Sequence, residues 1–192
     1  MDNEQAILRD VLAGNTRRYG ALIDLHKDRA MTLAVRLVGD RGEAEELVQD
    51  AFLRAYRNLD TFRGDAKFGT WFYRILYNLC MTKVTRRKPK PESIDDKEDG
   101  LMNAMIVDRD DVNALEQMED DEVQAIIGEE IKSLPEKYRA AVTLFYVQEM
   151  NYEEICATLD MPVGTVKTYL FRGRNILRDR VLQRTRDEVK VA

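Results

Sequence analysis

The chain has 192 residues, of which 44% are hydrophobic, 34% charged and 8% aromatic, enough apolar material for one globular domain or two small ones. Its longest run free of Asp, Glu, Lys and Arg, residues 140–148, is about half of a membrane-spanning helix, and the acidic N-terminus lacks the basic start and apolar core of a secretory signal. Because two cysteines, Cys80 and Cys156, cannot build a disulfide framework and match no metal-ligand spacing, we expect a cytoplasmic protein without membrane insertion.

The formal net charge of −5 conceals an uneven distribution along the chain. Residues 1–50 carry a net charge of −3, residues 51–90 of +8, residues 91–130 of −13 and residues 131–192 of +3. Two basic regions therefore flank one acidic segment. A nucleic-acid-binding protein shows such local basic character even when its average charge is negative.

Apolar residues recur at helical spacing along the chain, and repeated strand or hairpin signals are absent, so we expect an all-α fold. In the N-terminal half, the pattern predicts helices over residues 5–13, 17–38, 43–59 and 70–87. Gly39 suits the C-terminal cap of the second helix, and Asp40 with Glu43 resembles a capping box that starts the third. Tyr56 belongs to the predicted core stripe of that third helix.

An acidic stretch with little apolar material follows the fourth helix, which Pro89 and Pro91 end. We interpret residues 91–122 as a flexible acidic linker between two small helical domains, residues 1–90 and 123–192. A metal site from Asp95, Asp96 and Asp99 is the alternative, but nothing folds these carboxylates around an ion. We therefore expect no metal and no cofactor. In the second domain, helices are predicted over residues 123–133, 135–147, 152–159 and 163–183.

The strongest local signal is a helix-turn-helix pattern over residues 152–174, YEEICATLDMPVGTVKTYLFRGR. An eight-residue helix and a tight turn precede a basic helix, whose inward face would carry Val166, Leu170, Gly173 and Leu177. Another face carries short hydroxyls and long cations, which can reach base edges and phosphates in a major groove. These residues are Thr165, Thr168 and Arg172, with Lys167 and Arg174 at the edges. An ordinary helical hairpin with a solvated basic side is the alternative.

A second cluster combines aromatic and basic residues. Six of the chain's aromatic residues fall within residues 61–77: Phe62, Phe68, Trp71, Phe72, Tyr73 and Tyr77. Trp71, Arg74 and Asn78 share one face of the predicted helix, and positive charge continues through Lys83, Arg86 and Arg87. Rings beside cations can hold unpaired bases and their phosphates. For Trp71 and Tyr77, burial in a small core is an equally good interpretation; for Phe62 and Phe72 it is the better one.

A third signal lies on the predicted helix over residues 43–59, opposite its core stripe. Leu53 is an apolar side chain in the middle of a polar face made by Glu46, Gln49, Asp50 and Arg57. A single exposed leucine usually has no function. With polar groups around it, Leu53 could equally be the anchor of a protein interface.

Together these segments resemble a known family. The runs AEELVQDAFLRAYRNLDTFRG, FGTWFYRILYNLCMTKVTRRKPKP and LPEKYRAAVTLFYVQEMNYEEICATLDMPVGTVKTYLFRGRNILR are similar to regions 2 and 4 of the extracytoplasmic-function (ECF, group IV) sigma factors of bacterial RNA polymerase. The resemblance covers about residues 20–90 and 123–180. It implies a sigma factor that directs promoter recognition, DNA melting and transcription initiation, in a stress or envelope response.

The resemblance also implies partners and residue roles. The face with Glu46, Gln49, Asp50, Leu53 and Arg57 would bind the clamp helices of the polymerase core, and an anti-sigma factor would be a further partner. The loop over residues 60–69 and the helix after it would hold the minus-10 promoter element through Lys67, Trp71, Arg74, Tyr77, Asn78, Lys83, Arg86 and Arg87. The helix-turn-helix would touch the polymerase flap and read the minus-35 element through Thr165, Lys167, Thr168, Tyr169, Arg172 and Arg174.

Departures from the family pattern affect what can be transferred. Asp160 replaces the common turn glycine and tolerates a left-handed conformation better than most residues. Tyr169 stands where an arginine is usual, so the minus-35 sequence preference cannot be carried over.

Two other functions remain as alternatives: a ligand-responsive helix-turn-helix repressor, which leaves residues 61–90 unexplained, and a helical enzyme acting on nucleic acid. We expect no enzyme, because His26, the only histidine, has no nucleophile, phosphate loop or metal cluster beside it.

Overall fold

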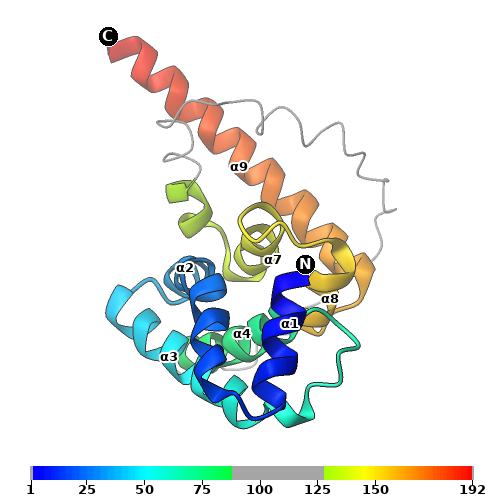
Figure 1. The fold of residues 1–192 in the computed structure, drawn as a ribbon. Coiled ribbons are helices and arrows are strands. Elements are labelled where there is room, and N and C mark those ends of the chain that lie inside the picture. Colours follow the sequence, from blue (N-terminus) through cyan, green and yellow to red (C-terminus); the bar gives the residue numbers. More distant parts are fainter. Residues whose placement is uncertain (1, 88–127, 192) are drawn as a thin grey trace.

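A computed structural model describes residues 2–87 and 128–191 of the chain (Figure 1). Every regular element in these two ranges is an α-helix or a short 3-10 helix, so the all-α prediction is confirmed. The predicted linker and the alternative metal site at Asp95, Asp96 and Asp99 lie outside the described residues. Within the described ranges, no helix combines the length and apolarity needed to cross a bilayer.

The N-terminal helices follow the predicted order with small shifts at their ends. The α-helices are α1 (Asp2–Leu12), α2 (Tyr19–Val38), α3 (Arg41–Arg57) and α4 (Phe68–Arg87). Short 3-10 helices, Thr16–Arg18 and Leu59–Thr61, precede α2 and follow α3. Helix α4 begins at Phe68, two residues before the predicted start, and the Phe68 side chain is buried. In Figure 1, α1 lies in front of α4 and beside α2.

Helix ends explain why α2 and α3 are separate elements. Gly39 adopts a left-handed conformation with φ of 79°, which a residue without a Cβ reaches at little cost. Asp40 caps α3 by accepting a hydrogen bond from the Glu43 amide at 2.8 Å. The Glu43 carboxylate contacts Lys83 and Arg87 of α4, so the capping box is made only by half.

Aromatic side chains fill the core of the N-terminal domain. Phe52 of α3 stacks on Phe72 of α4 with ring centroids 4.3 Å apart, and Phe68 stacks on Phe72 at 6.0 Å. The Tyr19 hydroxyl donates a 2.7 Å hydrogen bond to the Phe52 carbonyl, which satisfies a buried polar group. Tyr56, predicted in the core, is instead 40% exposed and packs the side of its ring on Tyr19 at 4.9 Å.

The C-terminal domain comprises helical residues 128–133, α7 (Glu136–Tyr146), α8 (Tyr152–Leu159) and α9 (Val163–Val191). Helix α9 continues eight residues beyond the predicted end and extends away from the body in Figure 1. The buried core of the C-terminal domain includes Ile131, Leu144 and Leu170.

The two domains pack against each other. Helix α8 lies against α4, and α7 lies against α2. The Gln148 amide donates a 2.8 Å hydrogen bond to the Arg29 carbonyl, and the Arg139 guanidinium contacts the Arg36 carbonyl at 3.3 Å. Burial lowers the pKa of Arg139, although its guanidinium also donates to the Leu134 carbonyl. These contacts connect what the sequence predicts as separate domains.

Candidate nucleic-acid and polymerase interfaces

The helix-turn-helix is built by local capping. The Asn151 side-chain oxygen accepts a hydrogen bond from the Glu154 backbone amide at 2.9 Å. The Glu154 carboxylate in turn accepts one from the Asn151 backbone amide at 3.0 Å. This reciprocal capping box starts α8. Asp160 ends the helix with φ of 57°, the left-handed conformation that the sequence predicts at this turn.

Close packing fixes α9 against α7. The inward side chains Val166, Leu170 and Leu177 are buried, as the pattern predicts. At Gly173, a Cβ atom would come within 2.6 Å of Val142 Cγ2 on α7. Glycine is therefore needed for the two helices to approach this closely. The opposite side of α9 is left facing outward.

The outward face of α9 holds only part of the predicted minus-35 set. Lys167 and Thr168 are exposed, whereas Thr165, Tyr169, Arg172 and Arg174 are half-buried. The Thr168 hydroxyl donates to the Gly164 carbonyl at 2.9 Å and keeps acceptor capacity for a partner. Tyr169 packs edge-on against Tyr138 at 5.4 Å, so its ring is engaged within the protein.

Phe171 is a surface residue that the sequence reasoning missed. It is 46% exposed and lies one helical turn after Lys167 and Thr168 on the same face of α9. The sequence pattern had centred the outward face on Thr165 and Arg172, about one position away. The signal that could have found Phe171 is its spacing of three and four residues from the exposed pair. A phenyl ring at this place can contact the methyl group of thymine in a major groove.

The predicted minus-10 residues are divided between two flanks of α4. On one flank, Trp71 and Asn78 line a cavity of about 390 Å³ between α3 and α4. The other residues lining this cavity are Arg54, Asn58, Thr61, Ile75, Leu79 and Thr82. Trp71 is half-buried and packs on Phe62 and Phe68 with ring centroids 5.3 and 5.7 Å apart, so these two rings hold its position at the cavity.

The other flank of α4 faces α8. Lys67 Nζ lies 2.7 Å from Glu154 Oε1, and Arg74 Nη2 lies 3.3 Å from Asp160 Oδ2. Burial, followed by the nearby Glu136 and Tyr169, raises the pKa of Tyr77. Lys67 and Arg74 thus pair with carboxylates of the C-terminal domain while they stay exposed, and Tyr77 is half-buried.

The basic end of α4 has a structural role in addition to its predicted one. Arg87 pairs with Glu43 and donates a 2.8 Å hydrogen bond to the Val38 carbonyl at the end of α2. Lys83 lies 3.6 Å from the same Glu43 carboxylate. Arg86 is exposed. The structure therefore keeps Arg86 at the surface and uses Arg87 to hold α2, α3 and α4 together.

The predicted polymerase-binding surface lies together on α3. Leu53 is 54% exposed, and Glu46, Gln49 and Arg57 are exposed around it. Asp50 is half-buried and bound by Arg54 at 3.0 Å. Tyr56, three residues after Leu53, adds an exposed ring to this face. The surface is thus an apolar pair, Leu53 and Tyr56, within a charged rim, the composition typical of a protein interface.

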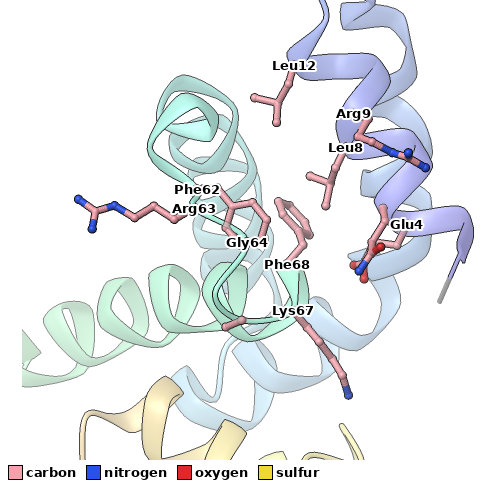
Figure 2. A pocket seen from close by; sticks show the side chains of 11 residues that line it. Glu4, Leu8, Arg9, Leu12, Phe62, Arg63, Gly64, Lys67 and Phe68 are labelled. Atoms are coloured by element: carbon pink, nitrogen blue, oxygen red, sulfur yellow. The ribbon is translucent and has the colours of Figure 1, made fainter.

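A second cavity, of about 410 Å³, lies between α1 and the loop before α4 (Figure 2). Leu8, Phe62 and Phe68 form its apolar wall, and Arg9, Arg63 and Lys67 also line it. In Figure 2 the Arg63 and Lys67 side chains extend away from Leu8 and Phe68. Sequence reasoning missed the contribution of α1, which His26 stabilises through a 2.7 Å contact with Glu4.

Among the described residues, no group of three His, Cys, Asp or Glu side chains could hold a metal ion.

Comparisons with known proteins agree with this arrangement. Residues 22–89 match the family model described as Sigma-70 region 2, and residues 124–177 match Sigma-70, region 4. The chain is 37% identical over 175 residues to the ECF RNA polymerase sigma factor SigW of Bacillus subtilis, covering 89% of this chain and 92% of the relative. It is 33% identical over 180 residues to the ECF RNA polymerase sigma-E factor of Escherichia coli K12, covering 93% and 94%.

Solved structures share the fold. CnrH, solved in complex with the cytosolic domain of CnrY, superposes with a TM-score of 0.66 at 21% identity, covering 93% of this chain and 96% of that one. The sigma factor RpoE of Bartonella quintana, solved with the anti-sigma factor NepR, gives a TM-score of 0.61 at 20% identity, covering 86% and 96%. With both conserved regions matched across most of its length, the chain belongs to the sigma-70 family of RNA polymerase sigma factors, in its ECF group.

Proposed function

We propose that this chain binds bacterial RNA polymerase core in the cytoplasm and directs it to promoters, without catalysis of its own. Residues 1–90 would bind the polymerase and the minus-10 element, residues 91–122 would link the domains, and residues 123–192 would bind the minus-35 element. The observation that carries this proposal is the presence in one chain of an exposed helix-turn-helix face and a separate cavity lined by a tryptophan and an amide.

The cavity between α3 and α4 suits an unpaired base of the minus-10 element. The Trp71 ring offers a stacking surface, and the Asn78 amide offers both a donor and an acceptor to a base edge. A duplex keeps these edges paired and its bases stacked, so the contacts form only when a strand is open. Lys67, Arg74, Lys83, Arg86 and Arg87 would neutralise phosphates beside it, and Tyr77 would add a second ring.

The outward face of α9 suits the major groove of the minus-35 element. Lys167 can reach a phosphate or a guanine edge, Thr168 can accept or donate at a base edge, and Phe171 can contact a thymine methyl. Thr165, Arg172 and Arg174 flank this face and would contact the backbone. Tyr169 would contribute by fixing α9 through Tyr138 and thereby orienting the reading face.

The α3 surface would bind the clamp helices of the polymerase core, with Leu53 and Tyr56 as its anchor, and the C-terminal domain would touch the flap. An anti-sigma factor is a further proposed partner, supported by the likeness in fold to an RpoE that was solved with one. A stress or envelope response is the proposed setting, since the named relatives are ECF sigma factors.

Run-off transcription with purified core polymerase on genomic fragments tests the proposal. We expect promoter-specific transcripts that require this chain, and no such transcripts from core polymerase alone. A repressor would instead bind symmetric half-sites tightly without polymerase in a gel-shift assay. Sequence-specific duplex binding by the isolated chain, with no dependent transcript, would refute the sigma-factor function.

A further inference from the structure

His26, the only histidine of the chain, connects α1 to the rest of the N-terminal domain. Its Nε2 atom lies 2.7 Å from Glu4 Oε1 on α1, and an ionised carboxylate only accepts, so Nε2 donates this hydrogen bond. The side chains of His26 and Glu4 are 14% and 24% exposed. Water therefore competes little for the contact, which is stronger here than it would be at an open surface.

The first turn of α4 packs against the other side of His26. The ring centroid of Phe68 lies 5.5 Å from that of His26, and the Phe72 centroid lies 5.9 Å from it. A Cβ atom at Gly69 would come within 3.3 Å of His26 Cε1, so the backbone of this turn passes close to the ring. His26 therefore fixes the place where α4 begins.

This turn also supports the cavity between α3 and α4. Trp71 packs on Phe68 with ring centroids 5.7 Å apart, and Trp71 lines the cavity. A continuous row of contacts thus runs from Glu4 on α1, through His26 and the start of α4, to Trp71. Figure 2 shows Glu4 and Phe68 on the two elements that line the neighbouring cavity.

We propose that His26 is a positioning residue for strand binding: held by Glu4, it seats the first turn of α4 and thereby keeps the Trp71 ring in place to stack on an unpaired base. The inference rests on the proposed function of the cavity between α3 and α4. It adds that α1, which contributes no residue to that cavity, controls how well the cavity binds a strand. A ring that is already held loses less conformational freedom on binding, so the restraint raises the affinity.

The size of the effect follows from the strength of the Glu4 contact. A hydrogen bond to a charged group is among the stronger ones in proteins, and both partners are largely shielded from water. Only molecules in which the first turn of α4 is in place bind the strand, so the apparent affinity falls with their fraction. Loss of the contact should weaken strand binding by about three- to tenfold.

The test uses four variants of the full chain. Glu4→Ala removes the acceptor, and Glu4→Gln keeps one at the same place. His26→Phe keeps a ring against the start of α4 but donates nothing to Glu4. The matched control is Asp10→Ala, since Asp10 is another carboxylate of α1 and pairs with Arg18 at 3.2 Å. Within the described ranges Asp10 makes no hydrogen bond or ion pair with His26 or α4, so the control loses the same charge without touching the proposed contact.

Trp71 is the only tryptophan of the chain, so its fluorescence reports on this site alone. The emission spectrum of the free chain is recorded first, and quenching by a short single-stranded DNA of randomised sequence then gives the strand affinity. Capture of core polymerase, proposed to use the separate surface on α3, is measured on the same samples and shows whether a variant keeps its fold.

We expect Glu4→Ala and His26→Phe to shift the Trp71 emission to longer wavelength and to weaken strand affinity by about three- to tenfold. Glu4→Gln should recover most of the affinity, and Asp10→Ala should behave as wild type. All variants should capture core polymerase. Combining Glu4→Ala with His26→Phe should weaken binding no further than either change alone, because both break the same contact.

Unchanged emission and affinity in Glu4→Ala would overturn the inference, and so would an equal loss in Asp10→Ala, because a general effect of charge on α1 would then be the cause. Additive losses in the double variant, or loss of polymerase capture, would also refute the positioning role. Absence of Trp71 quenching by the strand in the wild-type chain would refute the proposed function of the cavity, and the inference with it. Quenching in wild type that Glu4→Ala leaves unchanged would refute the positioning role alone.

Discussion

Gly173 lies where α9 passes closest to α7, and its replacement by alanine is a direct test of that packing. The added Cβ would lie 2.6 Å from Val142 Cγ2 and 3.4 Å from Tyr138 Cβ. Val142 is fully buried, so its methyl group has little room to retreat. Overpacking of a core costs about 1–3 kcal/mol, whereas the helix propensity of alanine returns about 0.8–1 kcal/mol. We expect a net loss of about 1 kcal/mol in the free energy of unfolding.

Urea unfolding followed by circular dichroism measures this loss, and a double-mutant cycle with Val142→Ala identifies its cause. Val142→Ala alone should cost about 2 kcal/mol from lost burial and a cavity. In the double variant the new methyl group occupies part of that cavity, so the combined loss should fall short of the sum by about 1–2 kcal/mol. Gly164→Ala on the same helix, with no atom within 4 Å of its Cβ, serves as the control and should not destabilise. Additive losses, or a stabilising Gly173→Ala, would refute the steric argument.

Three further outcomes follow from the exposed and buried groups. Leu53→Asp should leave the free energy of unfolding within about 0.5 kcal/mol of wild type and abolish capture of core polymerase in a pull-down, because an exposed anchor acts only in the interface. Asn78→Ala should impair promoter opening, and a pre-melted bubble should partly rescue it in filter binding, whereas Lys167→Ala should not be rescued. Burial raises the pKa of Cys80 to about 12 and, less strongly, that of Cys156, so at pH 7–8 both thiols stay protonated; iodoacetamide should modify half-buried Cys156 slowly and Cys80 only after unfolding.

Each of these outcomes has its own check. Leu25→Asp, on a leucine 49% exposed on α2, should retain polymerase capture; loss with both variants would indicate a general effect of charge. Equal rescue of Asn78→Ala and Lys167→Ala by the bubble would contradict the separation of strand and duplex contacts. Rapid modification of Cys80 in the folded chain, read by mass spectrometry, would show that its core is open to solvent.

The sequence by itself determined the helices, their caps and the helix-turn-helix. Gly39, Asp40 and Asp160 act within one or two turns of the chain, so their effects depend on neighbours that the sequence lists in order. The inward face of α9 was also predictable, since a helix repeats its faces at a fixed spacing. The aromatic cluster before and within α4, and the exposure of Leu53, followed from the same periodicity.

Only the tertiary structure decided how the predicted site residues are distributed. Periodicity gives the faces of a helix but not which neighbour each face meets, so it could not separate Trp71 and Asn78, which line a cavity, from Arg74, which pairs with Asp160 at the end of α8. Tyr56 is exposed, contrary to its predicted burial, for the same reason: its ring packs against Tyr19 of α2 and stays 40% exposed. Burial and pairing across α4 and α8 depend on residues more than 80 positions apart, and their positions are fixed by packing between domains, which local pattern does not encode.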